Sequence, residues 1–311
     1  MADSSPNSSL LPAVVYVNPN AGSGRALRGL PRIRKVFAEA SVPAEFISVG
    51  SAKDLESKAL AAIQSGKQLL FALGGDGTFQ ALVNATYGSD VVLGVLPAGG
   101  GNDFAAALQL PEDPVAAAKA ILRGRPMRVD LARARTADGR VRLYVGGGGL
   151  GIDAEAARYA NETFRRMPGR WRYIASALWA FCSHRAIEVT AEFPGSDLPS
   201  MEVDSLLAAA LNTPTYGSGI RLAPDARLDD GWLDAVVVED LSAFQVLKLL
   251  PRLLKSGELR TGHAHRVRVQ AVRFTTDRPC MFHGDGEIFG PTPAVIEVVP
   301  QAVRVLVPAQ N

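Results

Sequence analysis

Three glycine-rich segments of this chain each follow directly on a short apolar run. They are residues 18–24 after the run 13–17, residues 74–78 after the run 68–73, and residues 97–103 after the run 91–96. Helix-like stretches alternate with these runs and with a fourth, residues 45–49. Strands that alternate with helices form parallel sheets, and such sheets bind ligands at the carboxyl ends of their strands. The sequence therefore predicts an α/β domain with its glycine-rich loops at one binding edge.

After about residue 130 the pattern changes to many strand-like runs with few helices. The runs are residues 141–147, 186–193, 203–212, 233–238, 267–276, 294–298 and 303–307, and helix-like segments occur at 161–181 and 242–254. This pattern predicts an all-β sandwich. We expect a disordered tail over residues 1–12, the α/β domain over 13–127 and the sandwich over 128–308. We also expect Pro31 to interrupt the first helix.

The composition excludes several classes of protein. The 311 residues carry 33 basic and 31 acidic side chains, and a net charge of +2 provides no electrostatic footprint for nucleic acid. Two cysteines, Cys182 and Cys280, exclude a disulfide framework and a four-cysteine zinc site. No apolar stretch reaches the roughly 18 residues of a membrane span, and the N-terminus lacks the basic region of a signal peptide. We expect a cytoplasmic protein that does not bind nucleic acid.

The second glycine-rich loop reads Gly74-Gly75-Asp76-Gly77-Thr78. Glycines let the backbone approach a phosphate closely, and a helix that begins after the loop adds partial positive charge. Asp76 alone would repel a phosphate, but Mg²⁺ bridges carboxylates and phosphate oxygens. The loop therefore indicates a site for a metal and a nucleotide. The alternative is a glycine-rich turn capped by Thr78.

The other two loops have a similar character. In residues 97–103, three consecutive glycines precede Asn102 and Asp103, although either residue can simply cap a helix. Residues 18–24 are suited to hold further phosphates. The chain contains no G-x-x-x-x-G-K-[ST] sequence, which argues against a P-loop nucleoside triphosphatase.

Two more motifs lie in the second half of the chain. Residues 146–151 contain a formal G-x-G-x-x-G, but basic and aromatic residues follow, where a dinucleotide site needs an acidic residue. We favour close backbone packing over a dinucleotide site. Asp285 and Glu287 place two carboxylates on a turn after a strand. Either is suited to accept a proton from a substrate hydroxyl, and the alternative is an ordinary hairpin turn.

Together these motifs resemble the lipid kinase family with a diacylglycerol kinase catalytic domain, which includes bacterial diacylglycerol kinases and, more distantly, sphingosine and ceramide kinases. The resemblance covers residues 13–307, and it is carried by residues 18–22, 74–78, 97–105, 149–153, 223–231 and 284–287. It implies a three-layer, NAD-kinase-like α/β domain with a parallel sheet, a C-terminal β-sandwich and an active site in the cleft between them. Gly-Gly-Asp-Gly-Thr alone is shared with NAD kinases.

The resemblance also implies roles for individual residues. ATP would contact Asn18, Pro19, Asn20, Ala21, Gly22, Ser48, Gly74, Gly75, Asp76, Gly77, Thr78, Gly99, Gly100 and Asn102. The general base would be Asp285 with Glu287, and Asp76 is the alternative base. Mg²⁺ would bind Asp230 and the main-chain carbonyls of Arg227 and Trp232, with Asp103 linked through water. Gly100 replaces the threonine usual in the family, which removes a hydroxyl expected near the phosphates.

The implied activity is ATP-dependent phosphorylation of a lipid hydroxyl. Diacylglycerol is the first candidate substrate, and a sphingoid base, ceramide or an undecaprenol-like alcohol are alternatives. An NAD kinase or a non-catalytic nucleotide- or lipid-binding regulator are alternatives of other classes. Residues 164–185 mix arginines with aromatic side chains, which suits an anionic membrane surface as well as a packed helix, whereas for residues 242–255 we favour a packed helix. We expect peripheral membrane association, and an edge strand could support a homodimer.

Overall fold

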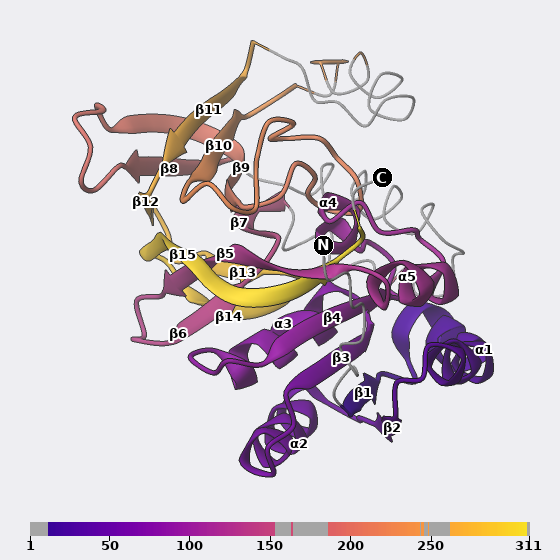
Figure 1. The fold of residues 1–311 in the computed structure, drawn as a ribbon. Coiled ribbons are helices and arrows are strands. Elements are labelled where there is room, and N and C mark those ends of the chain that lie inside the picture. The colour runs from indigo at the N-terminus through magenta and orange to yellow at the C-terminus, as the bar shows by residue number, and fades with distance from the viewer. Residues whose placement is uncertain are drawn as a thin grey trace, which may run out of the picture. The chain divides into compact units, whose positions relative to one another are not determined.

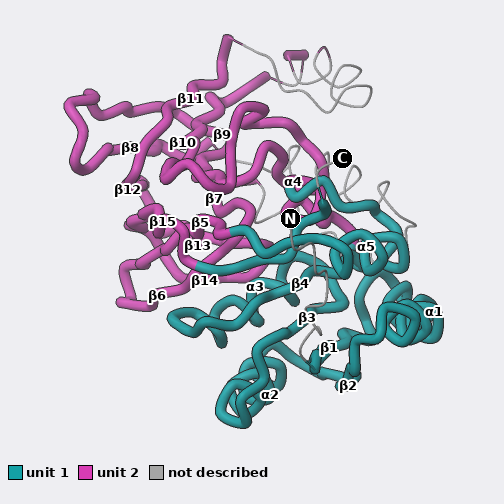
Figure 2. The backbone as a smooth tube through the Cα atoms, in the orientation of Figure 1, with its two compact units in different colours: residues 1–99, 108–127, 303–311 teal, residues 100–107, 128–302 magenta. Residues whose placement is uncertain are grey.

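The computed structural model describes residues 12–152, 163, 186–242, 244, 245, 248 and 262–309. The chain divides into two compact units, which Figure 2 shows in different colours. The first comprises Met1–Gly99, Leu108–Met127 and Val303–Asn311, and the second comprises Gly100–Ala107 and Arg128–Ala302. The division is therefore discontinuous along the chain. Asp153, Cys182, residues 164–185 and most of residues 242–255 lie outside the described residues.

A parallel sheet forms the centre of the first unit. Its strand β1 (Ala13–Val17) pairs with β2 (Ala44–Ser48) and β3 (Leu69–Gly74), and β3 also pairs with β4 (Val92–Pro97). The end of β15 (Ala294–Val307) pairs in parallel with β4. Every residue of β1 and β3 is buried, as expected for central strands that are covered on both faces.

Helices cover this sheet in two pairs. Helix α1 (Arg25–Glu39) packs with α5 (Pro114–Ile121), and α2 (Ala52–Gln64) packs with α3 (Asp76–Thr86). Figure 1 shows the two pairs on opposite sides of β1, β3 and β4. This arrangement confirms the predicted three-layer α/β domain. Among the described residues, no helix has the length and apolar character needed to cross a membrane.

The predicted interruption at Pro31 is wrong, because α1 continues through it. The inward face of this helix buries Ile33 and Phe37, and the Phe37 ring packs edge-on against Phe46 and Phe71 at centroid distances of 5.6 and 5.1 Å. A proline inside a helix removes one hydrogen bond and crowds the preceding turn. Burial of the apolar face offsets that cost, so the local signal is overridden.

The second unit consists mainly of antiparallel strands. They are β5 (Arg125–Arg135, which begins in the first unit), β6 (Val141–Tyr144), β7 (Gly147–Gly151), β8 (Ile187–Glu192), β9 (Met201–Leu211), β10 (Leu233–Glu239), β11 (Ala264–Val269), β12 (Ala271–Thr276), β13 (Met281–Gly284), β14 (Glu287–Pro291) and most of β15. Their order is β14-β13-β7-β9-β8-β12-β15, while β10 pairs with β9 and β11, and β5 pairs with β15 and β6. A short helix, α4 (Asp103–Ala107), also belongs to this unit.

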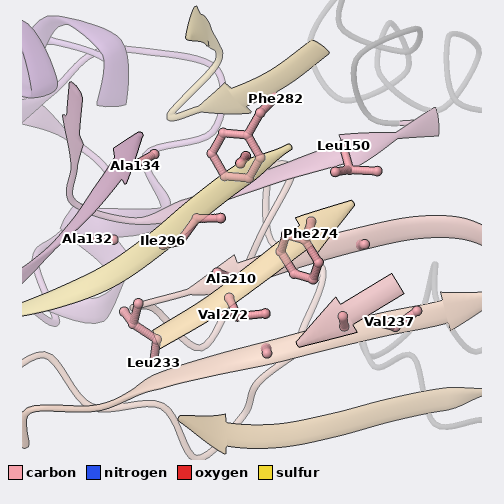
Figure 3. Close-up of a cluster of buried hydrophobic side chains, with 14 of the residues drawn as sticks. Ala132, Ala134, Leu150, Ala210, Leu233, Val237, Val272, Phe274, Phe282 and Ile296 are labelled. Atoms are coloured by element: carbon pink, nitrogen blue, oxygen red, sulfur yellow. The ribbon is translucent and has the colours of Figure 1, made fainter. Parts of the chain in front are cut away.

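An apolar core lies between these strands. Figure 3 shows Leu150, Phe274, Phe282 and Ile296 among its members, which come from β7, β12, β13 and β15. Burial of side chains from distant strands in one cluster is the expected stabilisation of a sandwich. The predicted C-terminal β-sandwich is confirmed.

Several predicted strand bounds are wrong. The runs 294–298 and 303–307 form one strand, β15, which passes through Gln301 with a φ of 49°. The run 267–276 is two strands separated at Gln270, and the run 141–147 divides between β6 and β7. The strand expected before the turn at Asp285 is β13, whereas β5 and β14 were not predicted. Apolar alternation does not reveal where one residue reverses or kinks a strand.

Candidate nucleotide and catalytic site

Asn18 links two of the glycine-rich loops of the first unit. It follows β1, and its backbone N–H donates to the carbonyl of Leu73 at 3.0 Å. Its side-chain amide donates to Thr78 Oγ1 at 3.0 Å, while its amide oxygen accepts from the backbone N–H of Asn20 at 3.1 Å. Residues 18–20 and 74–78 are therefore held together at the carboxyl ends of β1 and β3, as predicted.

Gly22 brings the first loop against the third. Its φ is 55°, in the left-handed region, and a Cβ atom there would overlap the carbonyl oxygen of Ala98. Arg25, at the start of α1, donates from Nε to the Ala98 carbonyl at 3.4 Å and from its other end to the carbonyl of Gly99. One arginine thus spans two successive carbonyls of the third loop.

The second and third loops also meet. The backbone N–H of Ala98 donates to the carbonyl of Gly74 at 2.7 Å, and a Cβ on Gly75 would lie 3.1 Å from Gly99 Cα. Asp76, Gly77 and Thr78 form the first turn of α3, and this turn is only partly buried. Three loops and one helix N-terminus therefore converge within the first unit, an arrangement that suits an anion.

The remaining nucleotide-contact candidates occupy less connected positions. Pro19 and Ala21 lie on the first loop, Ala21 being buried in the turn that leads into α1. Ser48 is exposed at the end of β2, beside Val17. Gly100 and Asn102 belong to the second unit, so the first unit does not bring them together with the other loop residues.

Asp103 anchors a loop of the second unit. Its Oδ1 accepts from Thr215 Oγ1 at 2.6 Å and from the backbone N–H of Gly219 at 2.9 Å, and its Oδ2 accepts from the Ser218 N–H at 3.0 Å. These three donors hold residues 215–219 against the start of α4. This partnership could not be predicted from the sequence, because more than a hundred residues separate the two segments.

Asp285 occupies the turn between β13 and β14 with a φ of 48°. Its Oδ2 accepts from the backbone N–H of Val145 at 2.7 Å, and its Oδ1 accepts from the N–H groups of Gly146 and Gly147 at 2.9 and 3.2 Å. Asp285 therefore forms the hairpin turn, and three backbone N–H donors fix its carboxylate in one orientation. Glu287 lies exposed at the start of β14.

The glycine-rich strand β7 packs closely, as we favoured. A Cβ on Gly148 would lie 2.7 Å from the Phe282 ring, and one on Gly147 would lie 2.6 Å from Tyr216. The strand pairs with both β9 and β13. The glycines at 147–149 therefore form a buried ladder and not a phosphate loop, so the dinucleotide interpretation of residues 146–151 is wrong.

The buried phenol of Tyr144 lies near the carboxylate of Asp285. Tyr144 donates to the carbonyl of Ala210 at 2.9 Å, and burial raises its pKa well above the usual 10.0, with the charge of Asp285 acting in the same direction. Tyr144 is therefore a neutral hydrogen-bond donor at any physiological pH.

The loop at Asp230 combines acidic and basic groups. Asp230 Oδ1 accepts from the Trp232 N–H at 3.1 Å, and its Oδ2 is paired with the guanidinium of Arg268. Burial raises the pKa of the neighbouring Asp234, although Arg266 and Arg268 act to lower it. Arg227 pairs with Asp229 at 3.4 Å.

The carboxylate and carbonyl oxygens of the Asp230 loop fit Mg²⁺, because Mg²⁺ prefers oxygen ligands of these kinds. Among the described residues, no group of three His, Cys, Asp or Glu side chains is arranged to hold a metal ion. A metal here would depend on the Asp230 carboxylate and on main-chain oxygens such as those of Arg227 and Trp232. It would also compete with Arg268 for Asp230.

Two family comparisons decide the classification of the chain. The diacylglycerol kinase catalytic domain matches residues 12–134, and the YegS C-terminal NAD kinase beta sandwich-like domain matches residues 148–307. This chain belongs to the diacylglycerol kinase and YegS-like lipid kinase family. The resemblance inferred from the motifs is confirmed, and the family implies the use of ATP, typically a divalent metal, and a lipid substrate.

Relatives within this lipid kinase family match along nearly their whole length. A diacylglycerol kinase of Mycobacterium tuberculosis (strain H37Rv) is 29% identical over 94% of this chain and 93% of its own. One from Bacillus subtilis is 25% identical over 96% and 97%. A Stenotrophomonas maltophilia protein named "Probable lipid kinase YegS-like" is 30% identical over 82% and 84%. A crystal structure of a diacylglycerol kinase from Bacillus anthracis shares the fold, with a TM-score of 0.72 at 20% identity over 97% of this chain and 98% of its own.

Proposed function

We propose that this protein transfers the γ-phosphoryl group of ATP to the hydroxyl of diacylglycerol, giving phosphatidic acid. The observation that carries the proposal is the convergence of three glycine-rich loops in the first unit, through Asn18–Thr78, Gly22–Ala98 and Arg25–Gly99. Loops that present backbone N–H groups at a helix start are suited to hold a triphosphate. Transfer of a phosphoryl group needs mainly positioning and charge neutralisation.

The proposed roles follow from these contacts. Residues 18–22 and 74–78 hold the phosphates of ATP, with Gly99 brought beside them by Arg25. Gly100, Asn102 and Ser48 are further contacts that we propose from the family pattern. The absent hydroxyl at Gly100 is then replaced by backbone N–H groups.

Asp285 is the base that we propose for the acceptor. The lipid hydroxyl forms a new O–P bond to the γ-phosphorus, the bond from that phosphorus to the β–γ bridging oxygen breaks, and the hydroxyl proton passes to the carboxylate. Three backbone donors fix the direction of that carboxylate before the substrate arrives. Glu287 and Asp76 are the alternative bases.

Mg²⁺ that accompanies ATP would supply charge neutralisation on the phosphate oxygens, and the metal ion at the Asp230 loop would be a separate, structural one. We propose that Asp230 and the main-chain carbonyls of Arg227 and Trp232 hold a metal ion, with Asp103 linked through water. The oxygen character of these groups supports the proposal. Titration with Mg²⁺ followed through tryptophan fluorescence tests it, because a saturable change is expected in wild type and its persistence in Asp230→Asn would contradict the site.

Turnover on a panel of acceptors tests the function. The purified protein is incubated with γ-labelled ATP, Mg²⁺ and mixed micelles that contain diacylglycerol, sphingosine, ceramide or undecaprenol, and with NAD in a separate reaction. Labelled phosphatidic acid is the expected product. A label found only in another lipid reassigns the substrate, label in NADP makes the protein an NAD kinase, and no label in any acceptor overturns the kinase proposal.

The base is tested by Asp285→Asn beside Asp197→Asn. Asp197 is an exposed carboxylate between β8 and β9 of the same unit, which makes it a matched control. We expect kcat to fall at least about 100-fold in Asp285→Asn and to stay within about twofold in Asp197→Asn. Full turnover in Asp285→Asn, with a large loss in Asp76→Asn or Glu287→Gln, moves the role to that residue.

We also propose that the protein reaches its substrate as a cytoplasmic protein that binds the membrane peripherally. Flotation with vesicles of neutral phospholipid, with and without an anionic lipid, measures this binding. Co-flotation that rises with the anionic fraction is expected, because peripheral attachment to an acidic leaflet is electrostatic. Absence of binding to vesicles of both compositions overturns the proposed peripheral association.

A homodimer through an edge strand stays a prediction, which light scattering tests.

A further inference from the structure

A network of buried polar side chains in the second unit connects to Asp285, the proposed base, and to the Asp230 loop, the proposed metal site. It centres on Asp130 of β5 and Asn212, which follows β9, and both side chains are fully buried, at 0% exposure. Asp130 Oδ2 accepts from the Gly231 N–H and its Oδ1 from the Gln301 N–H, each at 2.7 Å. The Asp130 N–H donates to the carbonyl of Leu228 at 2.6 Å.

Asn212 links strand β5, which carries Asp130, to residues 145–147. Its side-chain nitrogen donates to the carbonyls of Asp130 at 3.0 Å and Val145 at 2.9 Å, and its backbone N–H donates to the carbonyl of Gly146 at 2.8 Å. Two carbonyl acceptors fix which end of the amide is the nitrogen, because the opposite orientation would place three acceptors together. The network thus has a defined direction.

The network reaches Asp285 at one end, through Asn212, and the Asp230 loop at the other end, through Asp130. The N–H groups of residues 145–147 are those that hold Asp285. Gly231, held by Asp130, separates Asp230 from Trp232, which are two of the proposed metal ligands. Two segments far apart in the sequence are therefore joined through only two buried side chains.

The amide at position 212 uses its nitrogen and leaves its oxygen without a partner in the described part of the chain. Among the described residues, the Asn212 side-chain oxygen is the buried polar side-chain atom that has no hydrogen-bond partner. An unmet buried acceptor costs free energy, whereas the nitrogen of the same amide satisfies the buried carbonyls of Asp130 and Val145. The residue is more readily explained by what its nitrogen holds in place.

We infer that Asp130 and Asn212 are positioning residues for phosphoryl transfer, Asn212 acting through Asp285 and Asp130 acting through the Asp230 loop. The inference rests on the proposed function for the step that they serve. The partners that hold both side chains, at Gly231, Gln301 and residues 130 and 145, all belong to the second unit. Their loss should therefore change kcat and the metal requirement more than the KM for ATP.

Near-isosteric variants test the inference. Asn212→Asp replaces the donor with an oxygen that faces two carbonyls, and Asp130→Asn removes one acceptor from the pair of N–H groups. Asn212→Ser is a milder second variant in case Asn212→Asp does not fold. Ser205→Ala is the matched control. Ser205 is buried like Asn212 and lies on β9, and its hydroxyl donates to the Val238 carbonyl at 2.9 Å, outside the network.

Hydrogen–deuterium exchange gives a readout that needs no turnover. We expect faster exchange at residues 145–147 in the Asn212 variants and at Gly231 and Gln301 in Asp130→Asn, with no change at either place in Ser205→Ala. Unchanged exchange at these amides in folded variants overturns the inference whatever the activity. If the wild type phosphorylates no acceptor but exchange changes as expected, the proposed function fails and the structural link stands.

Kinetics then separates positioning from general loss of structure. We expect kcat to fall about tenfold or more in Asn212→Ser, with the KM for ATP within about twofold of wild type. In the Asp285→Asn background the same substitution should lower kcat by less than about twofold, because it acts through that carboxylate. Asp130→Asn should raise the Mg²⁺ concentration needed for half-maximal rate. Full additivity with Asp285→Asn, or a loss expressed only in the KM for ATP, contradicts the inference.

Discussion

Individual residues explain why the loops of the first unit converge. Gly22 is the clearest case, because its φ of 55° and the carbonyl of Ala98 leave no room for a side chain. We expect Gly22→Ala to lower the free energy of unfolding by at least about 2 kcal/mol and to raise the KM for ATP about tenfold or more. Chemical denaturation and ATP titration measure the two effects.

Gly88 supplies the control for that substitution. It has a φ of 82° and open space around its Cβ position, so Gly88→Ala carries the backbone strain without the collision. A loss of about 1 kcal/mol with an unchanged KM for ATP is expected. Equal effects of the two variants would show that strain, and not contact between the loops, determines the result.

Arg25 is a second residue on which the loops depend. Its guanidinium spans the carbonyls of Ala98 and Gly99, a geometry that an ammonium does not reproduce. We expect both Arg25→Ala and Arg25→Lys to raise the KM for ATP about five- to tenfold in kinetic assays. Arg32→Ala, on the exposed face of the same helix, should leave the KM unchanged. Normal ATP affinity in Arg25→Lys would assign the role to charge alone.

Motif residues could be predicted at this scale, whereas their partners could not. Asp285 is recognisable in the sequence as a carboxylate between glycines, but the three N–H groups that hold it lie about 140 residues earlier. Arg25, Thr215 and Asn212 carry no local signal, since each is defined by a carbonyl or carboxylate from a distant strand or loop. Spacing along the chain does not encode such contacts.

At the scale of elements, helix α1 shows how packing overrides a local signal. Pro31 lies in its seventh position and is exposed, so the helix lacks one internal hydrogen bond without losing its buried face. We expect Pro31→Ala to raise the free energy of unfolding by about 1–3 kcal/mol. Urea denaturation measures the change. Lys35→Ala, also exposed on α1, should change it by less than about 0.5 kcal/mol, and a destabilised Pro31→Ala would contradict this account.

Strands were predicted well where both faces are buried and poorly where the chain turns. The runs that became β1, β3 and β4 are largely apolar and stop at Asn18, Gly74 and Pro97, which are residues typical of turns, so the type and the end of each strand were evident. β13 was expected only as a strand without bounds before the turn at Asp285, and β14 was missed, because both strands are short and carry glycine. β5 was missed because its first residues are exposed and basic.

At the scale of the whole molecule, each unit buries a tyrosine. Tyr16 lies in β1 of the first unit, and burial raises its pKa to about 12, with the charge of Glu45 acting in the same direction. Tyr144 lies in β6 of the second unit and its pKa is also raised, chiefly by burial. Both phenols are therefore neutral in the folded protein over a pH range in which an unfolded chain ionises them.

This difference predicts a loss of stability in alkali. The unfolded chain releases these protons near pH 10, whereas the folded protein retains them, so the free energy of unfolding is unaffected below about pH 10 and declines as the pH rises toward 12. Denaturation in urea at about pH 8, 9, 10 and 11, with tyrosinate absorbance followed in parallel, measures the decline. Tyr16→Phe should flatten the part that belongs to the first unit, whereas Tyr87→Phe, at a tyrosine that is 45% exposed, should retain the wild-type profile. Equal stability of the wild type at pH 9 and 11 would contradict the burial of both phenols, because only a group that titrates differently in the two states makes stability depend on pH.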